Sequence, residues 1–173
     1  MRAREYCGSA AASALSRRPA PKTPVNVVIS PTIAYTWVMT LRLSSNDWQQ
    51  LLDWAKSAGD AECCGLLRGM DGRVAEVSLT ENVAPEPSRN FEINPAALIA
   101  VHKDVRAGGA PLLGYFHSHP NGLEEPSATD VAQAAADDRF WLIIAGRAIT
   151  AWRPAVMEGH VTGFTPVTLV VEG

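Results

Sequence analysis

The segment GYFHSHPNGLEEPSATD, residues 114–130, constrains the fold more than any other part of the chain. Apolar residues run into His117 and His119, and the Pro-Asn-Gly that follows predicts a turn. Ser127 and Asp130 match a Ser-x-x-Asp capping box, which begins a helix. Because side chains alternate along a strand, both imidazoles point to the same face. The segment therefore predicts a strand, a turn and a helix that bring two imidazoles and a carboxylate together.

These three side chains predict a metal site. Catalytic zinc sites commonly have three protein ligands and one open position for water. His117, His119 and Asp130 supply two nitrogen donors and one oxygen donor, which suits zinc. The donor types also suit iron or manganese, so the sequence predicts one divalent ion, with zinc as the first choice.

A further acid, Glu62, precedes the apolar Cys-Cys-Gly-Leu-Leu. A carboxylate next to buried sequence is either paired or functional. If Glu62 faces the metal site, it can take a proton from water and deliver it to a leaving amine. Ser127 has two alternative roles: it caps its helix, or it also donates a hydrogen bond to a developing oxyanion.

Taken together, Glu-Cys-Cys-Gly-Leu-Leu, His-Ser-His-Pro and Ser-x-x-Asp resemble the motif of the JAMM (MPN+) metalloproteases. The resemblance covers residues 41–171. The chain lacks the long insertions with which eukaryotic relatives hold ubiquitin, so it is similar to the compact prokaryotic branch. The segment NFEINP, residues 90–95, is a weaker match to that branch.

The resemblance implies a role for each motif residue. It implies that His117, His119 and Asp130 bind one zinc ion per chain, that Glu62 is the general acid/base, and that Ser127 stabilises the oxyanion. It also implies a cytidine-deaminase-like JAMM architecture. The implied activity is hydrolysis of a peptide or isopeptide bond at the C-terminal tail of a small ubiquitin-like or sulfur-carrier protein.

The periodicity over residues 39–173 predicts a single α/β domain, with a mixed, mainly antiparallel sheet and helices on both sides. Ser44 and Asp47 match a capping box for the first helix, and Pro95 begins the second. The remaining expected elements are a strand at 41–43, hairpins at 63–68 with 73–79 and at 141–145 with 149–153, a strand at 112–117, a helix at 127–137, and two short closing strands at 161–164 and 167–171.

Residues 1–38 differ from the rest, being rich in Ala, Ser, Arg and Pro. We expect a disordered or non-native extension. Two alternatives are a transit peptide and a natural start at Met39, from which strand and helix signals follow directly.

Charge and composition exclude other classes. Residues 1–40 carry a net charge of +4 and the remainder −7. An acidic body is a poor nucleic-acid binder, because phosphate neutralisation supplies most non-specific affinity. No apolar run reaches the roughly 18–20 residues that span a bilayer. The odd count of cysteines, Cys7, Cys63 and Cys64, argues against a disulfide framework and favours a cytoplasmic location.

Three rival functions share parts of the pattern. A non-catalytic MPN-type interaction scaffold usually lacks ligands, and none is missing here. A RadC-type protein, associated with DNA repair, has a related motif, but the acidic body disfavours DNA. A nucleoside deaminase requires a His-x-Glu and a Pro-Cys-x-x-Cys, and the chain has neither.

Overall fold

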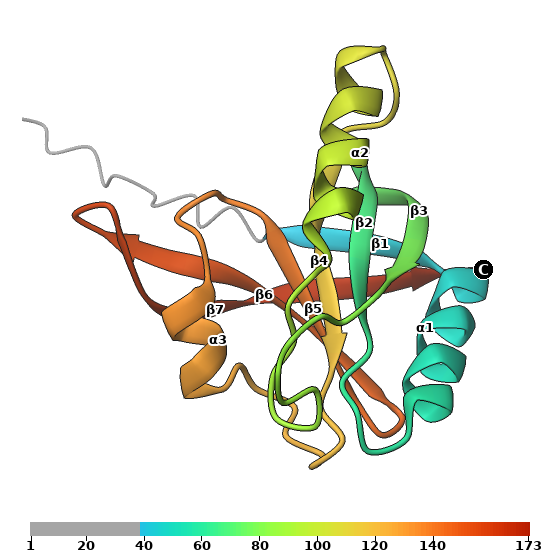
Figure 1. Ribbon diagram of the computed structural model, residues 1–173. Coiled ribbons are helices and arrows are strands. Elements are labelled where there is room, and N and C mark those ends of the chain that lie inside the picture. Colours follow the sequence, from blue (N-terminus) through green and yellow to red (C-terminus); the bar gives the residue numbers. More distant parts are fainter. Residues whose placement is uncertain (1–38) are drawn as a thin grey trace, which may run out of the picture. The chain divides into compact units, whose positions relative to one another are not determined.

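The computed structural model describes residues 39–173 (Figure 1), so the expectations for residues 1–38 lie outside the described part. Residues 39–173 form seven strands and three helices. In chain order the elements are β1 (Thr40–Ser44), α1 (Ser45–Ala58), β2 (Cys64–Met70), β3 (Arg73–Thr80), α2 (Pro95–Arg106), β4 (Leu112–Ser118), α3 (Ala128–Gln133), β5 (Phe140–Ala145), β6 (Ala148–Met157) and β7 (His160–Glu172). None of these helices is long and apolar enough to cross a membrane.

The strands form one sheet in the order β1-β3-β2-β4-β5-β6-β7, and β7 returns to β1 to close a barrel. Four neighbouring pairs are antiparallel and three are parallel. The expected mixed, mainly antiparallel sheet is therefore confirmed. Its closure was not predicted, and the cytidine-deaminase-like architecture stays a prediction.

The two expected closing strands are wrong, because one continuous strand, β7, replaces them. Its first part pairs with β6 up to the register pair Ala151–Val167, and its second part pairs with β1 from Thr168 onward. Pro166 lies just before this change of partner, opposite Trp152. The strand continues past the proline because a new neighbour takes over the ladder there.

Helices cover both faces of the sheet, as expected. α1 begins where Ser44 accepts a hydrogen bond from the Asp47 N–H, and it packs Leu51 into a core with Phe116 and β1, β5 and β6 residues. α2 packs Val101 into a second core with residues of β2 and β5. Side chains of β2 and β5 point to opposite faces of the sheet, so each strand contributes to the core under α1 and to the core under α2. One sheet therefore supports both helices.

α3 is shorter than the expected helix at 127–137 and ends at Gln133. Asp137 accepts hydrogen bonds from the Tyr115 hydroxyl and from Arg139. These contacts hold the segment in a non-helical turn, which overrides the helix preference of the alanines before it. What remains of α3 is the first turn and a half, and this part carries Asp130.

Candidate metal centre and active site

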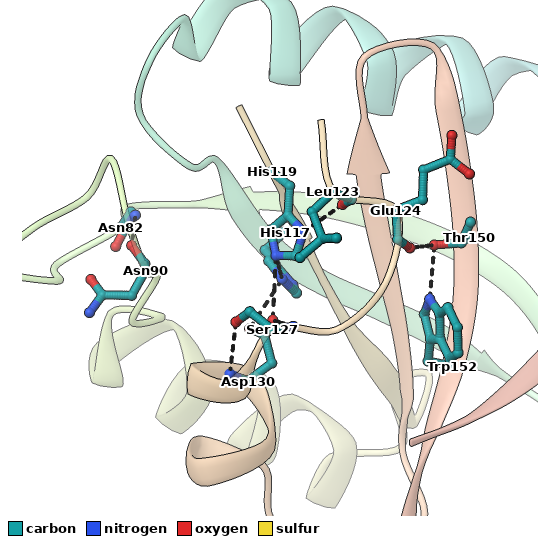
Figure 2. Close-up of polar contacts among 10 residues, drawn as sticks. All are labelled: Asn82, Asn90, His117, His119, Leu123, Glu124, Ser127, Asp130, Thr150 and Trp152. Atoms are coloured by element: carbon teal, nitrogen blue, oxygen red, sulfur yellow. Dashed lines mark hydrogen bonds and ion pairs between the residues drawn. The ribbon is translucent and has the colours of Figure 1, made fainter. Parts of the chain in front are cut away.

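The structure brings the three expected ligands together in a buried cluster (Figure 2). One ligand atom from each of His117, His119 and Asp130 lies within 4.8 Å of the others. The two Nε2 atoms are 3.0 Å apart. Asp130 Oδ1 lies 3.3 Å from His117 Nε2, and Asp130 Oδ2 lies 3.4 Å from His119 Nε2. All three side chains are at least 95% buried.

Strand pairing at the end of β4 positions the two histidines. β4 runs between β2 and β5, so His117 is held opposite Cys64 on one side and Ile143 on the other. The His119 N–H donates to the Ile144 carbonyl at 2.8 Å, which extends the ladder past the strand end. The spacing of two residues therefore places both imidazoles on one face, as the sequence predicted.

Different contacts orient the two rings. His119 Nδ1 lies 2.7 Å from the Leu123 carbonyl, so it carries the proton and donates, which leaves the Nε2 lone pair facing the cluster. His117 is held by ring packing: Phe91 stacks on it with centroids 4.3 Å apart, and Trp141 meets it edge-on at 5.8 Å.

The first turn of α3 holds Asp130. The Ser127 N–H donates to Asp130 Oδ2 at 2.6 Å, and the Asp130 N–H donates to Ser127 Oγ at 3.2 Å. This is the predicted capping box. Asp130 Oδ2 therefore both closes the cap and faces His119. Ser127 Oγ accepts within this cap, and in the described part of the chain no acceptor for its O–H is recorded.

The donor set fits a cation. With His119 in the tautomer set by Leu123, lone pairs of nitrogen and carboxylate oxygen converge on one buried point, and such an arrangement is repulsive unless a cation or proton lies among them. Burial raises the pKa of Asp130, but its hydrogen bonds with the histidines hold that pKa well below its usual range. Burial lowers the pKa of His117, so this imidazole favours its neutral, ligating form. Burial opposes the charged form of His119, but contacts with Asp130 and Leu123 raise its pKa overall.

Glu62 lies two residues before β2 and is 6% exposed, close enough to the cluster for His119 and Asp130 to act on its charge. Burial raises its pKa to about 7, an effect reduced by His119 and reinforced by Asp130. A carboxyl group with a pKa near neutrality is suited to accept and return a proton. The structure thus brings together all five residues that the sequence singled out.

Four contributors around the site were not predicted from the sequence. Ser118 Oγ accepts from the Cys63 N–H at 2.9 Å, Phe91 stacks on His117, the Leu123 carbonyl fixes His119, and Asn82 contacts the Glu62 main chain. Phe91 falls in the NFEINP segment, which was the one available signal. No sequence signal indicated Asn82, because an asparagine in a Pro-rich loop looks like an ordinary turn residue.

The neighbouring thiols do not extend the site. Cys63 and Cys64 are both buried and free. Burial raises the pKa of each thiol, to about 11 for Cys64. Burial and a raised pKa both disfavour the reactive thiolate, which fits a packing role for these two residues.

A family model matches residues 44–155: prokaryotic homologs of the JAB domain. The match runs from the N-cap of α1 into β6 and includes all five site residues. It covers well over half of the chain.

Curated relatives and a solved structure agree with that match. The desampylase of Haloferax volcanii is 34% identical over 109 residues, which are 60% of this chain and 78% of the relative. A probable TtuB-protein conjugate cleaving protease of Thermus thermophilus is 38% identical over 53 residues, 31% of this chain and 36% of that relative. The solution structure of protein DSY2949 from Desulfitobacterium hafniense aligns with a TM-score of 0.65 and 26% identity, covering 78% of this chain and 93% of that one.

Proposed function

The chain belongs to the family of prokaryotic homologs of the JAB domain, the compact prokaryotic branch of the JAMM/MPN+ metalloproteases, and it is a JAMM-type isopeptidase; from that premise we propose that it uses zinc to hydrolyse a peptide or isopeptide bond at the C-terminal tail of a ubiquitin-like or sulfur-carrier protein. The zinc site is supported by one observation: three buried donor atoms converge near the buried carboxyl group of Glu62. The substrate class is supported by the names of two relatives, a desampylase and a probable conjugate-cleaving protease.

We assign the ion to His117, His119 and Asp130, one per chain. A zinc ion held there would supply Lewis acidity to the scissile carbonyl and would make water more acidic. Because Nδ1 of His119 donates to the Leu123 carbonyl, the lone pair of its Nε2 would be free to bind the ion. Asp130 stays ionised because its pKa is well below the usual range.

Glu62 and Ser127 carry the proton and charge steps of the proposal. Glu62 removes a proton from the attacking water as the oxygen bonds to the carbonyl carbon. When the carbon–nitrogen bond breaks, Glu62 returns that proton to the leaving amine. Ser127 turns its O–H toward the carbonyl oxygen as negative charge develops there. The Oγ lone pair meanwhile keeps its bond from the Asp130 N–H.

An extended substrate tail has a strand edge available near Glu62. Within residues 39–173, β1 joins β3 at a single register pair, Arg42 with Arg73. The remaining outer edge of β3 leads to Thr80, which pairs with Cys64, two residues after Glu62. Main-chain pairing along such an edge is a common way to bind an extended peptide.

The test uses the full chain and two substrates: a sulfur-carrier protein joined through its C-terminal glycine to a lysine of a second protein, and the same carrier in linear fusion. We expect zinc-loaded wild type to release the carrier from at least one of them. Glu62→Gln should lose about a hundredfold or more in turnover, since a positioned base contributes about 10²–10⁴-fold. A Glu62→Gln variant as active as wild type contradicts the mechanism. A zinc-free, inactive wild type supports a scaffold instead.

A further inference from the structure

The loop between β3 and α2 holds Glu62 by its main chain. The Glu62 N–H donates to the Pro87 carbonyl at 2.6 Å. Its carbonyl accepts from Asn82 Nδ2 at 2.9 Å. Both partners belong to residues 81–94, which are about twenty or more positions away in sequence, so tertiary structure alone brings them to Glu62.

Asn82 connects this loop through all its side-chain groups. Besides the Glu62 carbonyl, Nδ2 donates to the Asn90 carbonyl at 3.2 Å. Oδ1 accepts from the N–H groups of Ala84 and Glu92, both at 3.0 Å. Figure 2 shows Asn82 and Asn90 next to each other on the loop. One amide therefore ties four main-chain groups of two segments into a single unit.

The opposite side of the Glu62 peptide is held by the strand that carries the histidines. The Cys63 N–H donates to Ser118 Oγ, and the Ser118 N–H donates to the Cys63 carbonyl, both at 2.9 Å. Glu62 thus stands between β4 on one side and the loop on the other. The same loop also places Phe91 against His117.

We propose that Asn82 is a positioning residue for the general base: it acts through the main chain of Glu62 and fixes the direction in which that carboxyl group points. The inference rests on the proposed function. A general base must lie within hydrogen-bond reach of the proton it removes, and a misplacement of about 1 Å can cost roughly a hundredfold in rate. Removing the Asn82 donor leaves the Glu62 carbonyl without its hydrogen bond and frees the loop side of the peptide.

Asn82→Asp is the sharpest variant, because it keeps the oxygen acceptor for Ala84 and Glu92 and removes both N–H donors. Asn94→Ala is the matched control. Asn94 ties the same loop, accepting from the Ala96 N–H and donating to Glu81 Oε2, and neither of these hydrogen bonds involves Glu62. Both variants lose side-chain hydrogen bonds from residues 81–94, and only the first loses one to the base.

We expect Asn82→Asp to bind one zinc per chain and to lose about tenfold or more in kcat, with KM within about twofold of wild type. Asn94→Ala should keep its kcat within about twofold. Amide hydrogen exchange at Glu62 should be about tenfold faster in Asn82→Asp and unchanged in Asn94→Ala. If Asn82→Asp does not fold, Asn82→Ala takes its place with the same expectations, since it adds no carboxylate beside the carbonyls.

A double-mutant cycle with Glu62→Gln separates positioning from general stability. Once the base is absent, Asn82→Asp should cause no further loss of residual turnover. An equal fold loss in both backgrounds overturns the proposal, as does wild-type kcat in folded, zinc-loaded Asn82→Asp. If wild type cleaves neither conjugate, the proposed function fails and the exchange measurement alone decides: an unchanged Glu62 amide then overturns the positioning role.

Discussion

His117 Nε2 and His119 Nε2 lie 3.0 Å apart, in a region where neither side chain is more than 3% exposed. Two imidazole nitrogens this close, with carboxylate oxygens of Asp130 at 3.3 and 3.4 Å, require a positive charge or a proton among them. This relationship makes metal content and metal-dependent stability the first properties to measure.

Zinc content should separate the ligands from the base. We expect about one zinc per purified wild-type chain, and its loss in His117→Ala, His119→Ala and Asp130→Asn, because each removes one of three donors. Glu62→Gln should retain the ion, because the carboxyl group is outside the donor set. Elemental analysis of the dialysed proteins checks this. Full zinc occupancy in Asp130→Asn contradicts the assignment of that ligand.

Metal removal should lower thermal stability. A ligand that binds the folded state alone stabilises it by RT ln(1 + [L]/Kd), about 4 kcal/mol at a thousandfold excess over Kd. We expect a strong chelator to lower the Tm of wild type and added zinc to restore it. Asp130→Asn serves as control, since its Tm should not respond to either treatment. Equal responses from both proteins would show that the ion acts elsewhere.

The raised pKa of Glu62 predicts a pH-dependent effect on metal-free stability. Its pKa is about 7 in the folded protein against an ordinary 4.5, so the folded state holds the proton more tightly than the unfolded state does. That stabilisation is complete below pH 4.5 and is lost as pH rises through 7. Metal-free Glu62→Gln should therefore melt close to wild type at pH 4.5 and above it at pH 8. Melting curves in chelator test this, and a Tm difference that does not grow with pH contradicts it.

Ser127→Ala should separate the capping and catalytic roles of the hydroxyl. Losing a helix cap typically costs about 1 kcal/mol of stability. Losing one oxyanion donor typically costs roughly a hundredfold or more in turnover. We expect a small fall in Tm and a large fall in kcat, measured by thermal melting and conjugate cleavage. Near-normal turnover in a folded, zinc-loaded variant would leave Ser127 with the observed cap as its only role.

Ser127→Asp provides the complementary variant. Aspartate caps a helix as well as serine does, but its carboxylate cannot donate to an oxyanion. We expect a Tm near wild type with almost no activity. Zinc content and substrate binding must be measured in the same protein, because the new carboxylate lies close to the metal ligands.

Gly65→Ala should destabilise the strands that carry the site. A Cβ at Gly65 would lie 2.1 Å from the Ser78 carbonyl oxygen and 2.4 Å from the Phe116 ring, so β2 cannot keep its place between β3 and β4. We expect a loss of roughly 3 kcal/mol or more. Gly163→Ala in β7 is the control, because nothing lies within 4 Å of its Cβ. Chemical denaturation compares the two, and equal midpoints contradict the packing argument.

Much of the candidate site could be predicted because its signals are local. The two-residue spacing of His117 and His119 sets a common face on any strand, and Ser127 caps a helix through Asp130 three residues later. Glu62 is far from them in sequence, and its place beside them was predicted from its apolar neighbours and from the family resemblance. The hairpins and the first helix were likewise predicted from turn and capping residues.

Long-range pairing decided the rest. β7 is one continuous strand because β6 pairs with its first part and β1 pairs with its second part. The sequence around Pro166 contains no signal for either neighbour. The early end of α3 depends on contacts of Asp137 with Tyr115, 22 residues away.

By itself, then, the sequence determined which side chains carry chemistry, because spacing, capping and alternation act over a few residues. The tertiary structure alone decided how those side chains are held. Asn82 reaches the Glu62 carbonyl, and Phe91 stacks on His117, only because a loop, two strands and a helix pack into one body. Such contacts depend on the summed burial of many distant residues, and no short stretch of sequence records that sum.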